Sequence, residues 1–350
     1  MAMATHIIGW DIGGAHLKAA LLNAEGRIEH VVQRPCPLWQ GVGHLFRALD
    51  DALSELPADI ETHAITMTGE LVDCFDSREQ GVKAIVNALC VRLGERNLQV
   101  FAGPDGFLAA DAIENRHILT IASANWLASA SLAAIKQRDA LFVDLGSTTC
   151  DILVINKHRL SNVGYTDYQR LVSGELLYTG VVRTAVVAIA QAAEFNGRSM
   201  GLMAEYFATM ADVYRVTGEL NEAHDQSPTA DGAEKTAVAS ARRLSRMTGY
   251  DFRSSDWPLW LNFAGYLKQK QKQMVHAACL RQKLAGQLPH SAVLIGAGVG
   301  RFLLAEVAAD LGMEYRDFND LLPPAVNSGV VDAADCAPAT AVAYLAGGFG

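Results

Sequence analysis

The sequence predicts an α/β fold made of two similar halves, each a mixed sheet covered by helices, which face each other across a central cleft. The chain has 350 residues, more than one ordinary compact domain holds. Its pattern of short strands begins again near residue 140, as in a duplication. In both copies a strand ends in an aspartate, Asp11 or Asp144, and leads through a glycine-containing turn into a second strand. We therefore place the first half at residues 1–137 and the second half at residues 138–350.

The first half opens with three strands in a row and then alternates helices with strands. Turn residues and strand periodicity predict an antiparallel meander over residues 6–11, 17–23 and 27–33. Apolar residues at helical spacing and short apolar runs predict the elements that follow. We expect helices at 42–56, 78–93 and 125–136, and strands at 63–67 and 98–102.

The second half repeats this opening and then carries an insert. Strands are predicted at 140–144, 151–156 and 159–163. Residues 165–250 are rich in Gly, Thr and aromatic residues and exceed the usual loop length, so we interpret them as a largely irregular functional insert. The remaining expected elements are helices at 234–247 and 257–285, a strand at 292–295, the glycine cluster 296–300, a helix to residue 311 and a last helix at 338–345.

Composition excludes several classes of protein. Half of the residues are hydrophobic and 19% are charged, which is typical of a folded globular chain. The net charge of −9 argues against nucleic acid as a partner, and no run of about eighteen apolar residues predicts a membrane span. The N-terminus has no signal-peptide pattern, and the six cysteines form no C-x-x-C pair. These features predict a cytoplasmic protein without disulfides or a zinc site.

The first motif runs from Asp11 to Lys18. Gly13, Gly14, Ala15 and His16 form its turn, where small residues let backbone N–H groups approach an anion such as phosphate. Asp11 is a candidate ligand for hydrated Mg²⁺, and Lys18 supplies a point charge. The alternative is a tight hairpin that carries a solvated lysine.

The second motif, from Asp144 to Asp151, makes the first more informative. Gly146 begins its turn, and Ser147, Thr148 and Thr149 add hydroxyl donors for the same anion. A third cluster contains Gly296 and Gly298 and lies between a strand and a helix, whose N-terminal amides suit a further anionic or ribose group. Together the three clusters predict a site for phosphate or a nucleotide between the two halves.

These motifs resemble the superfamily that includes actin, Hsp70, sugar kinases and acetate kinase, whose fold is a duplicated ribonuclease H-like unit. Each half of those proteins presents a phosphate loop, and an adenosine loop follows later in the second half. The third cluster departs from the usual pattern because Val299-Gly300-Arg301 follows it. The sequence shows no clear sugar-binding loop, so a sugar kinase is not our first prediction.

A closer resemblance involves segments outside the common motifs. Residues 67–75, 123–126, 144–151, 173–184 and 205–214 together resemble hydantoinase/oxoprolinase-related proteins of the tetrahydromethanopterin-linked one-carbon pathway. The resemblance implies a cytoplasmic transferase in methanofuran or methylofuran biosynthesis. Its expected reaction joins an aminomethyl-furanmethyl diphosphate to a tyrosine- or tyramine-type phenol, forming an aryl ether and releasing diphosphate. Mg²⁺ is an expected cofactor, and ATP is left open.

Several residues are candidates for parts of that reaction. Glu70 and Glu175 each occur in a Ser/Thr-Gly-Glu-Leu segment and are candidate general bases, although such turns also begin or end helices. Lys18 would stabilise the leaving group. Arg183 would bind the diphosphate or a substrate carboxylate, or else pair with Asp167 or Glu175. Asp151 and Asp73 are further candidate metal ligands.

Two other readings stay open for this sequence. One is an ATP-dependent small-molecule kinase or an ATP-driven amidohydrolase of the same fold, which would release ADP. The other is a nucleotide-gated binding protein, for which the sequence shows no peptide-binding domain. The oligomeric state and the particular phenol do not follow from the sequence.

Overall fold

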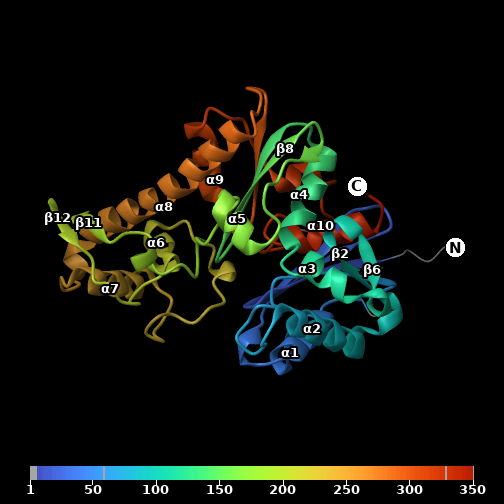
Figure 1. The fold of residues 1–350 in the computed structure, drawn as a ribbon. Helices are drawn as coiled ribbons and strands as arrows, with labels where there is room; N and C mark the ends of the chain where they lie inside the picture. The colour runs from blue at the N-terminus through green and yellow to red at the C-terminus, as the bar shows by residue number, and fades with distance from the viewer. Residues whose placement is uncertain (1–5, 58–59, 328, 350) are drawn as a thin grey trace.

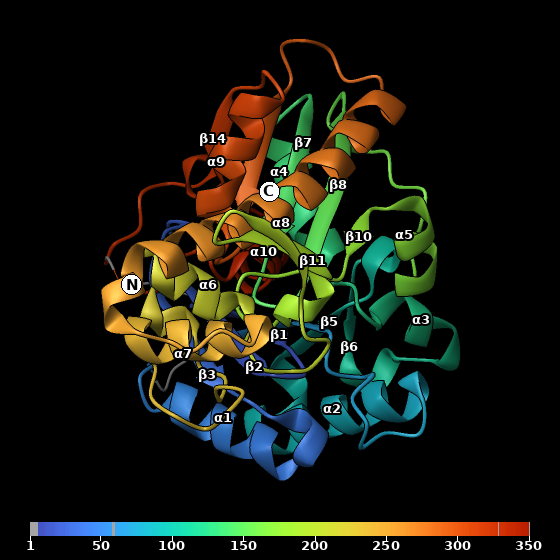
Figure 2. The ribbon, with the colours of Figure 1, turned by 90° about the vertical axis from the view of Figure 1, so that its left-hand side faces the viewer.

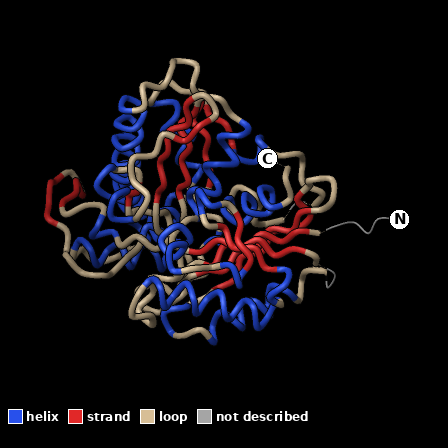
Figure 3. Tube along the Cα trace, turned by 45° about the vertical axis from the view of Figure 1, so that its right-hand side comes forward, coloured by secondary structure: helices blue, strands red, loops and turns tan. Residues whose placement is uncertain are grey.

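The computed structural model describes residues 6–57, 60–327 and 329–349. Residues 1–5, part of the segment from which we argued against a signal peptide, lie outside this range. The described chain contains two six-stranded sheets and a small two-stranded one. The two large sheets, one from each half, are visible as separate groups of strands in Figure 3.

The first sheet has the strand order β3-β2-β1-β4-β5-β6. Its central strand, β1, is buried along its whole length and pairs antiparallel with β2 and parallel with β4. Such a strand reads as a continuous apolar run because helices cover both of its faces. The strands are β1 (Ile7–Ile12), β2 (His16–Leu22), β3 (Ile28–Pro35), β4 (Thr62–Met67), β5 (Leu98–Phe101) and β6 (Phe107–Ala109).

The helices of the first half are α1 (Gly43–Leu53), α2 (Arg78–Leu93), α3 (Ile118–Ile121) and α4 (Asn125–Lys136). The bounds predicted for α2 and α4 are confirmed. Ser77 caps α2 by accepting a hydrogen bond from the Gln80 N–H, and Gly94 ends it with a positive φ of 85°. In Figure 1, α1 and α2 lie together below the first sheet. The short elements β6 and α3 were not predicted.

The second sheet has the order β10-β8-β7-β13-β14, with β9 paired to β8. Its strands β8, β7, β13 and β14 repeat the order β2, β1, β4 and β5 of the first sheet, which confirms the duplicated fold. The strands are β7 (Ala140–Leu145), β8 (Cys150–Asn156), β9 (Arg159–Leu160), β10 (Leu176–Leu177), β13 (Val293–Ala297) and β14 (Tyr315–Asp317), and the helices α9 (Arg301–Asp310) and α10 (Ala337–Ala346) follow in the same half.

The last helix, α10, returns from the second half to the first. It packs against β1, β2, β4 and α4. Gly9 of β1 makes this possible, because a Cβ there would lie 1.9 Å from the carbonyl oxygen of Ala339. One buried cluster joins Ile7 of the first sheet to Phe142 and Val293 of the second. The two halves therefore share a core through α4 and α10.

The insert is more regular than predicted. It contains α5 (Asp167–Ser173), the hairpin β11 (Ala192–Phe195) and β12 (Arg198–Gly201), α6 (Met210–Thr217) and α7 (Ala237–Thr248). Except for α7, we predicted no regular elements here, and that prediction was wrong. The elements are short and end in glycines, so their local composition resembles that of loops.

The insert packs around the long helix α8 (Trp257–Ala285), whose predicted bounds are confirmed. At 29 residues this helix is about 43 Å long. Figure 1 shows β11, β12, α6 and α7 grouped around one end of α8, away from the second sheet, and Figure 2 views α6, α7 and β11 from that end. Phe195 of β11 lies 5.2 Å from Trp260 and 5.5 Å from Phe263 between ring centres, so aromatic packing fixes the hairpin on α8.

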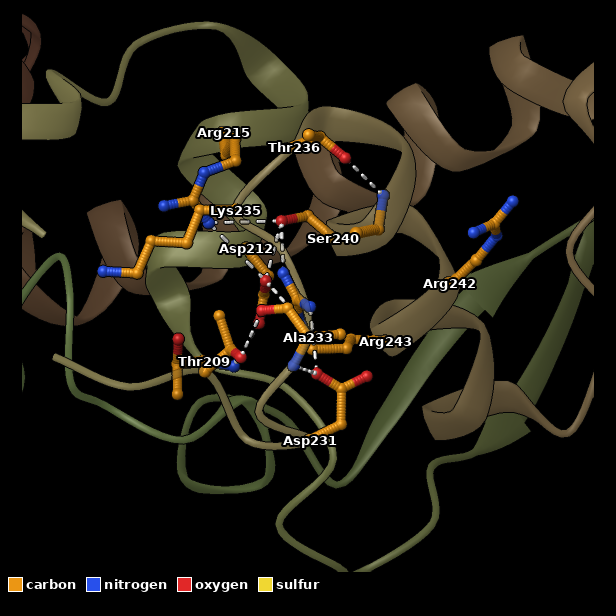
Figure 4. Close-up of polar contacts among 12 residues, drawn as sticks. Thr209, Asp212, Arg215, Asp231, Ala233, Lys235, Thr236, Ser240, Arg242 and Arg243 are labelled. Carbon is orange, nitrogen blue, oxygen red and sulfur yellow. Dashed lines mark hydrogen bonds and ion pairs between the residues drawn. The ribbon is translucent and has the colours of Figure 1, made fainter.

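A buried network of charges holds α6 and α7 together (Figure 4). The fully buried guanidinium of Arg243 donates to Asp212 Oδ1 at 2.7 Å and to Asp231 Oδ1 at 3.1 Å. Arg215 donates to Asp225 Oδ2 at 2.6 Å. Buried charges of this kind are tolerated because each one is paired and hydrogen-bonded.

No single helix in the described part of the chain is long and apolar enough to span a membrane. The segments Asn115–Ile121 and Asn125–Lys136 pass the same test only as a pair that is bent by 67°.

Candidate active site

A cleft of about 520 Å³ lies where the two halves meet. It brings together most of the residues that the sequence singled out, although they are far apart along the chain. Neither Glu70 nor Glu175, and neither Gly296 nor Gly298, is among its lining residues. The predicted residues that do line it are Asp11, Gly13, Gly14, Ala15, His16, Lys18, Asp73, Asp144, Gly146, Ser147, Thr148, Thr149, Asp151 and Arg183.

The first glycine turn (residues 13–16) joins β1 to β2. Its ends are closed by a hydrogen bond of 2.9 Å from the Gly13 N–H to the carbonyl of His16. A Cβ on Gly13 would lie 2.7 Å from that same carbonyl oxygen, and one on Gly14 would lie 2.8 Å from Val72. Burial lowers the pKa of His16 to about 3, and the nearby charges of Lys18 and Arg183 act in the same direction. His16 therefore faces the cleft as a neutral ring.

The second glycine turn (residues 146–149) joins β7 to β8. The Gly146 N–H donates to the carbonyl of Thr149 at 2.8 Å. Gly180 packs directly on this turn, since a Cβ there would lie 2.3 Å from the backbone of Ser147. The Arg183 N–H then donates to the Ser147 carbonyl at 2.8 Å, so the segment behind the turn brings Arg183 to the cleft.

Arg183 reaches across to the first half. Its guanidinium lies 5.6 Å from the ring centre of Trp39, a cation–π distance. The two acidic partners that we considered for it are engaged elsewhere, Asp167 with Arg78 and Glu175 with backbone N–H groups. The structure thus leaves the guanidinium of Arg183 at the cleft with an aromatic contact and no ion pair among the described residues.

Two buried carboxylates and a lysine form the floor of the cleft. Burial raises the pKa of Asp11 to about 6 and that of Asp144 to about 7; in both cases the ammonium of Lys18 opposes the rise. The pKa of Lys18 is raised as well: burial opposes its charge, but Asp11 and Asp144 together with other nearby groups outweigh that effect. Lys18 also donates to the carbonyl of Asp335 at 3.0 Å, which holds its side chain in place.

The residues present fit a hydrated divalent cation in one respect. Asp11 Oδ1 is buried and has no hydrogen-bond partner within the described residues. Such an oxygen is expected where a cation, or a water molecule bound to it, completes the site. However, no three His, Cys, Asp or Glu side chains of the described chain lie close enough to hold a metal ion directly. Asp11 and Asp144 would therefore hold Mg²⁺ mainly through water.

The other two candidate metal ligands are placed differently. Asp151 accepts a hydrogen bond of 2.6 Å from Arg170 and is committed to that buried ion pair. Asp73 lies at the exposed rim. Neither carboxylate shares the buried, unpartnered environment of Asp11.

Arg170 is a cleft residue that the sequence analysis missed. It is almost fully buried, and its guanidinium stacks 4.2 Å above the ring centre of Trp126. The Trp126 ring is itself buried and is held edge-on by Tyr165. Arg170 lies in α5, which was not predicted, so only its spatial neighbours reveal it. The cleft therefore contains three cationic side chains: Lys18, Arg170 and Arg183.

Glu70 lies behind the cleft wall. Its side chain is fully buried, and Ser123 Oγ donates to its Oε1 at 2.7 Å. Burial raises the pKa of Glu70 to about 7, although the hydrogen bond from Ser123 acts in the opposite direction. Ser123 and Asp167, unlike Glu70, line the cleft.

Glu175 occupies a closed loop. Its carboxylate accepts hydrogen bonds from the N–H of Val163 at 2.6 Å, from the N–H of Gly164 at 2.8 Å and from Ser173 Oγ at 2.7 Å. A carboxylate that satisfies three donors away from the cleft holds the loop between β9 and α5. This geometry does not support Glu175 as the base.

The third glycine cluster supports the second turn from behind. The N–H of Gly298 donates to the carbonyl of Ala334 at 2.8 Å, and that of Gly300 donates to the carbonyl of Leu145 at 2.7 Å. Arg301, which follows, forms ion pairs with Asp317, Asp332 and Asp335. The geometry does not support a ligand-binding role for Gly296 and Gly298.

Two sheets of matching strand order, with paired glycine turns that meet at one cleft, define the actin, Hsp70 and sugar-kinase class of fold. A nucleotide-free acetone carboxylase structure shares this fold, with a TM-score of 0.56 at 11% identity over 89% of this chain and 68% of that one. The chain belongs to the hydantoinase/oxoprolinase family, whose sequence profile matches residues 61–328.

Two archaeal relatives carry the same name, (4-{4-[2-(gamma-L-glutamylamino)ethyl]phenoxymethyl}furan-2-yl)methanamine synthase. The protein from Methanocaldococcus jannaschii is 30% identical over 271 residues, which cover 77% of this chain and 79% of that protein. The protein from Methanococcus vannielii is 32% identical over 111 residues, or 31% of this chain and 49% of that protein. This chain is therefore an enzyme, and a transferase fits it at the level of reaction class.

Proposed function

We propose that this enzyme joins an aminomethyl-furanmethyl diphosphate to a phenol of the tyrosine or tyramine type, with release of diphosphate. The observation that carries the proposal is the convergence of both glycine turns with Lys18 and Arg183 in one cleft. The relatedness to synthases whose name describes a phenoxymethyl-furan product supports the same reaction. In the cell this would be a step in the biosynthesis of a methanofuran- or methylofuran-type cofactor, linked to tetrahydromethanopterin-dependent one-carbon transfer.

The chemistry requires stabilisation of a leaving diphosphate. As the carbon–oxygen bond to the diphosphate breaks, negative charge grows on the oxygens while the electron-rich furan stabilises the carbon that is left. Backbone N–H groups of the two turns, the neutral ring of His16 and the ammonium of Lys18 would bind those oxygens. Each preorganised donor of this kind contributes on the order of 3 kcal/mol.

Mg²⁺ would add to this stabilisation. When bound near Asp11 and Asp144, it would supply positive charge to the diphosphate oxygens. Arg183 would bind the outer phosphate or an acceptor carboxylate, since a planar guanidinium suits either group.

The rim of the cleft suits aromatic substrates. Trp39, Leu71 and Tyr178 line the cleft and are exposed large side chains on its edge. Exposed aromatic and apolar groups at a polar cleft are expected where flat rings bind, and the furan and phenol rings are such groups.

The reaction transfers no phosphoryl group and therefore requires no ATP. The ion pairs of Arg301 also occupy the region behind the third glycine cluster, where the superfamily resemblance placed an adenosine loop. The alternative function is that of an ATP-dependent kinase or amidohydrolase, and the following test distinguishes it from the proposed reaction.

The test incubates the purified protein with Mg²⁺, the furan-methyl diphosphate and tyrosine, tyramine or γ-glutamyl-tyramine, with and without ATP. We expect a new aryl ether by mass spectrometry and an equal amount of diphosphate, both unchanged by ATP. Release of ADP or phosphate from ATP without ether formation would overturn the proposal. Comparison of the three acceptors identifies the preferred phenol.

A further inference from the structure

Ser123 lies between two carboxylates at the wall of the cleft. Its Oγ is 2.7 Å from Glu70 Oε1 and 3.3 Å from Asp167 Oδ2. The side chain of Asp167 is 29% exposed and lines the cleft, whereas that of Glu70 is fully buried behind it. The three groups therefore form a line from the cleft to the protein interior.

The number of protons in this line is limited. A serine hydroxyl has one proton to donate and lone pairs that accept. If both carboxylates were ionised, Ser123 could donate its single proton to only one of them. No proton would then lie between Ser123 Oγ and the other carboxylate. One additional proton satisfies the line: Ser123 donates to one carboxylate and accepts from the other, and either carboxyl group can hold the extra proton.

We propose that Asp167 is the group that takes the phenol proton and that Ser123 passes a proton on to Glu70. The inference rests on the proposed function, because it assigns the base of that reaction. Asp167 would be the catalytic residue, since it alone of the two carboxylates faces the cleft. Ser123 and Glu70 are positioning residues that act through it.

The surroundings hold the line in place. Arg78 contacts Asp167 Oδ2 at 3.3 Å, which orients this carboxylate. Gly81 of α2 lies against Glu70, because a Cβ there would be 2.1 Å from the Glu70 carbonyl oxygen. Ser123 itself adopts a positive φ of 51°, an uncommon conformation for a residue other than glycine. Such strain persists where surrounding contacts over-determine it, often at functional sites.

The environment of Glu70 suits an acceptor of protons. The charged groups that act on it are Asp167, which favours its protonated form, and Arg78, which favours the ionised form. Burial is the larger effect and raises its pKa to about 7. Glu70 Oε2 is buried and has no hydrogen-bond partner in the described part of the chain.

The proposed step balances. The phenol oxygen forms its bond to the furan-methyl carbon as the bond from that carbon to the diphosphate breaks. Both carboxylates are ionised at the start, and the phenol supplies the additional proton. It moves to Asp167 and then to Ser123 Oγ, while the original Ser123 proton moves to Glu70 Oε1, so Asp167 ends ionised and Glu70 protonated. Glu70 must be ionised beforehand, so we expect kcat to rise with pH through the titration of Glu70.

A measurement without substrate tests the line itself. Protein labelled with ¹³C at its glutamate carboxyl carbons is titrated by NMR between about pH 5 and 9. We expect one glutamate with a pKa near 7 that is absent from E70Q. Its pKa should fall in D167N, where a like charge is removed, and rise in S123A, where a hydrogen bond to the carboxylate is lost. No shift in either variant would overturn the proposal.

Kinetics then test the role of each group. We expect D167N to lower kcat by about 100-fold and S123A by about 10-fold. S123G and S123A both lack the hydroxyl, so we expect the same kcat for both variants. Only S123G also relieves the positive φ at this position. S129A, which removes a buried hydroxyl within α4, is the control and should keep the wild-type rate and pH profile.

Two readouts separate proton transfer from a structural effect. E70Q should lose the rise of kcat with pH, and an acceptor phenol of lower pKa should react with D167N more nearly at the wild-type rate. Unchanged pH profiles in E70Q and S123A, or no gain from the acidic phenol, would overturn the proposal. Absence of ether formation by wild-type protein would instead overturn the proposed function and leave the NMR result to stand by itself.

Discussion

Gly298 and Asp144 lie so close that no side chain fits between them. A Cβ on Gly298 would be 2.3 Å from Asp144 Oδ1 and 2.4 Å from the carbonyl oxygen of Leu145. Gly298 also has a positive φ of 82°. The glycine therefore allows β13 and the start of α9 to press against the end of β7, which sets the position of Asp144 at the cleft.

We predict that G298A destabilises the protein more than G312A does. Both glycines have a positive φ, but a Cβ on Gly312 would meet nothing within 4 Å. The G312A variant should lose about 1 kcal/mol of unfolding free energy from backbone strain alone. Overlap with Asp144 should raise the loss in G298A to roughly 2–4 kcal/mol. Urea unfolding of both variants checks this, and equal losses would contradict it.

Lys18 should dominate the binding of diphosphate. K18M keeps most of the side-chain volume but removes the charge beside Asp11 and Asp144. We expect the Kd for inorganic diphosphate, measured by calorimetry with Mg²⁺ present, to rise on the order of 100-fold. K272M is the control, since Lys272 pairs with Glu306 and Asp310 away from the cleft. A similar loss in both variants would indicate a general charge effect.

The buried carboxylate of Asp144 should destabilise the folded protein at neutral and higher pH. Burial raises its pKa from 3.8 to about 7, so the folded state binds a proton more tightly than the unfolded state. The free energy of unfolding should therefore fall as pH rises between about 4 and 7. Removal of this carboxylate in D144N should make the protein more stable than wild type at pH 8, by at most about 4 kcal/mol.

Urea unfolding at about pH 4 and 8 in the presence of a chelator checks this prediction. The difference between D144N and wild type should be small at the lower pH, where Asp144 is protonated in the folded state and only about half ionised in the unfolded state. An equal difference at both values would show that the effect comes from packing.

The charge network of the insert offers a matched pair of arginines. Arg243 is fully buried and contacts Asp212 and Asp231, whereas the side chain of Arg246 is 49% exposed and, among the acidic residues that the structure describes, contacts only Asp231. R243A should lose about 3–5 kcal/mol because it removes a fully buried guanidinium and with it the 2.7 Å ion pair of the buried Asp212. R246A should lose less than about 1 kcal/mol. Hydrogen exchange should show faster exchange in α6 and α7 of R243A alone.

Glu175 should prove structural. E175Q cannot satisfy all three donors that its carboxylate now satisfies. We expect a lower melting temperature, by several degrees, with kcat within about twofold of wild type. E79Q, which changes an exposed carboxylate paired with Lys83, should leave both quantities unchanged. A large fall in kcat at full folding would return Glu175 to the list of candidate bases.

Long periodic helices and the two glycine turns were predictable from the chain. The bounds of α2, α4 and α8 match the structure. The signals that mark them act locally, such as the Ser77 cap and Gly94 of α2 and the proline near the start of α8. The first and second turns were recognised because a strand, an aspartate and glycines occur within a few residues. Such signals do not depend on distant parts of the chain.

The acidic groups show the limit of that approach. Glu70 and Glu175 share the same local pattern, yet one lies beside Ser123 at the cleft wall and the other closes a loop. Asp167 and Arg170 carry no distinctive local signal and reach the cleft only because α5 packs against the first half.

Local residue order thus predicted the duplicated α/β fold, the paired glycine turns, and Lys18 directly after the first of them. Tertiary packing decided which charged groups meet, how deeply each is buried and therefore which of them has a shifted pKa. Burial and pairing depend on residues separated by tens to hundreds of positions, such as Lys18 and Asp335 or Ser123 and Glu70. Because the strength of an electrostatic interaction is set by that surrounding medium, the chemistry of this site is a property of the folded chain.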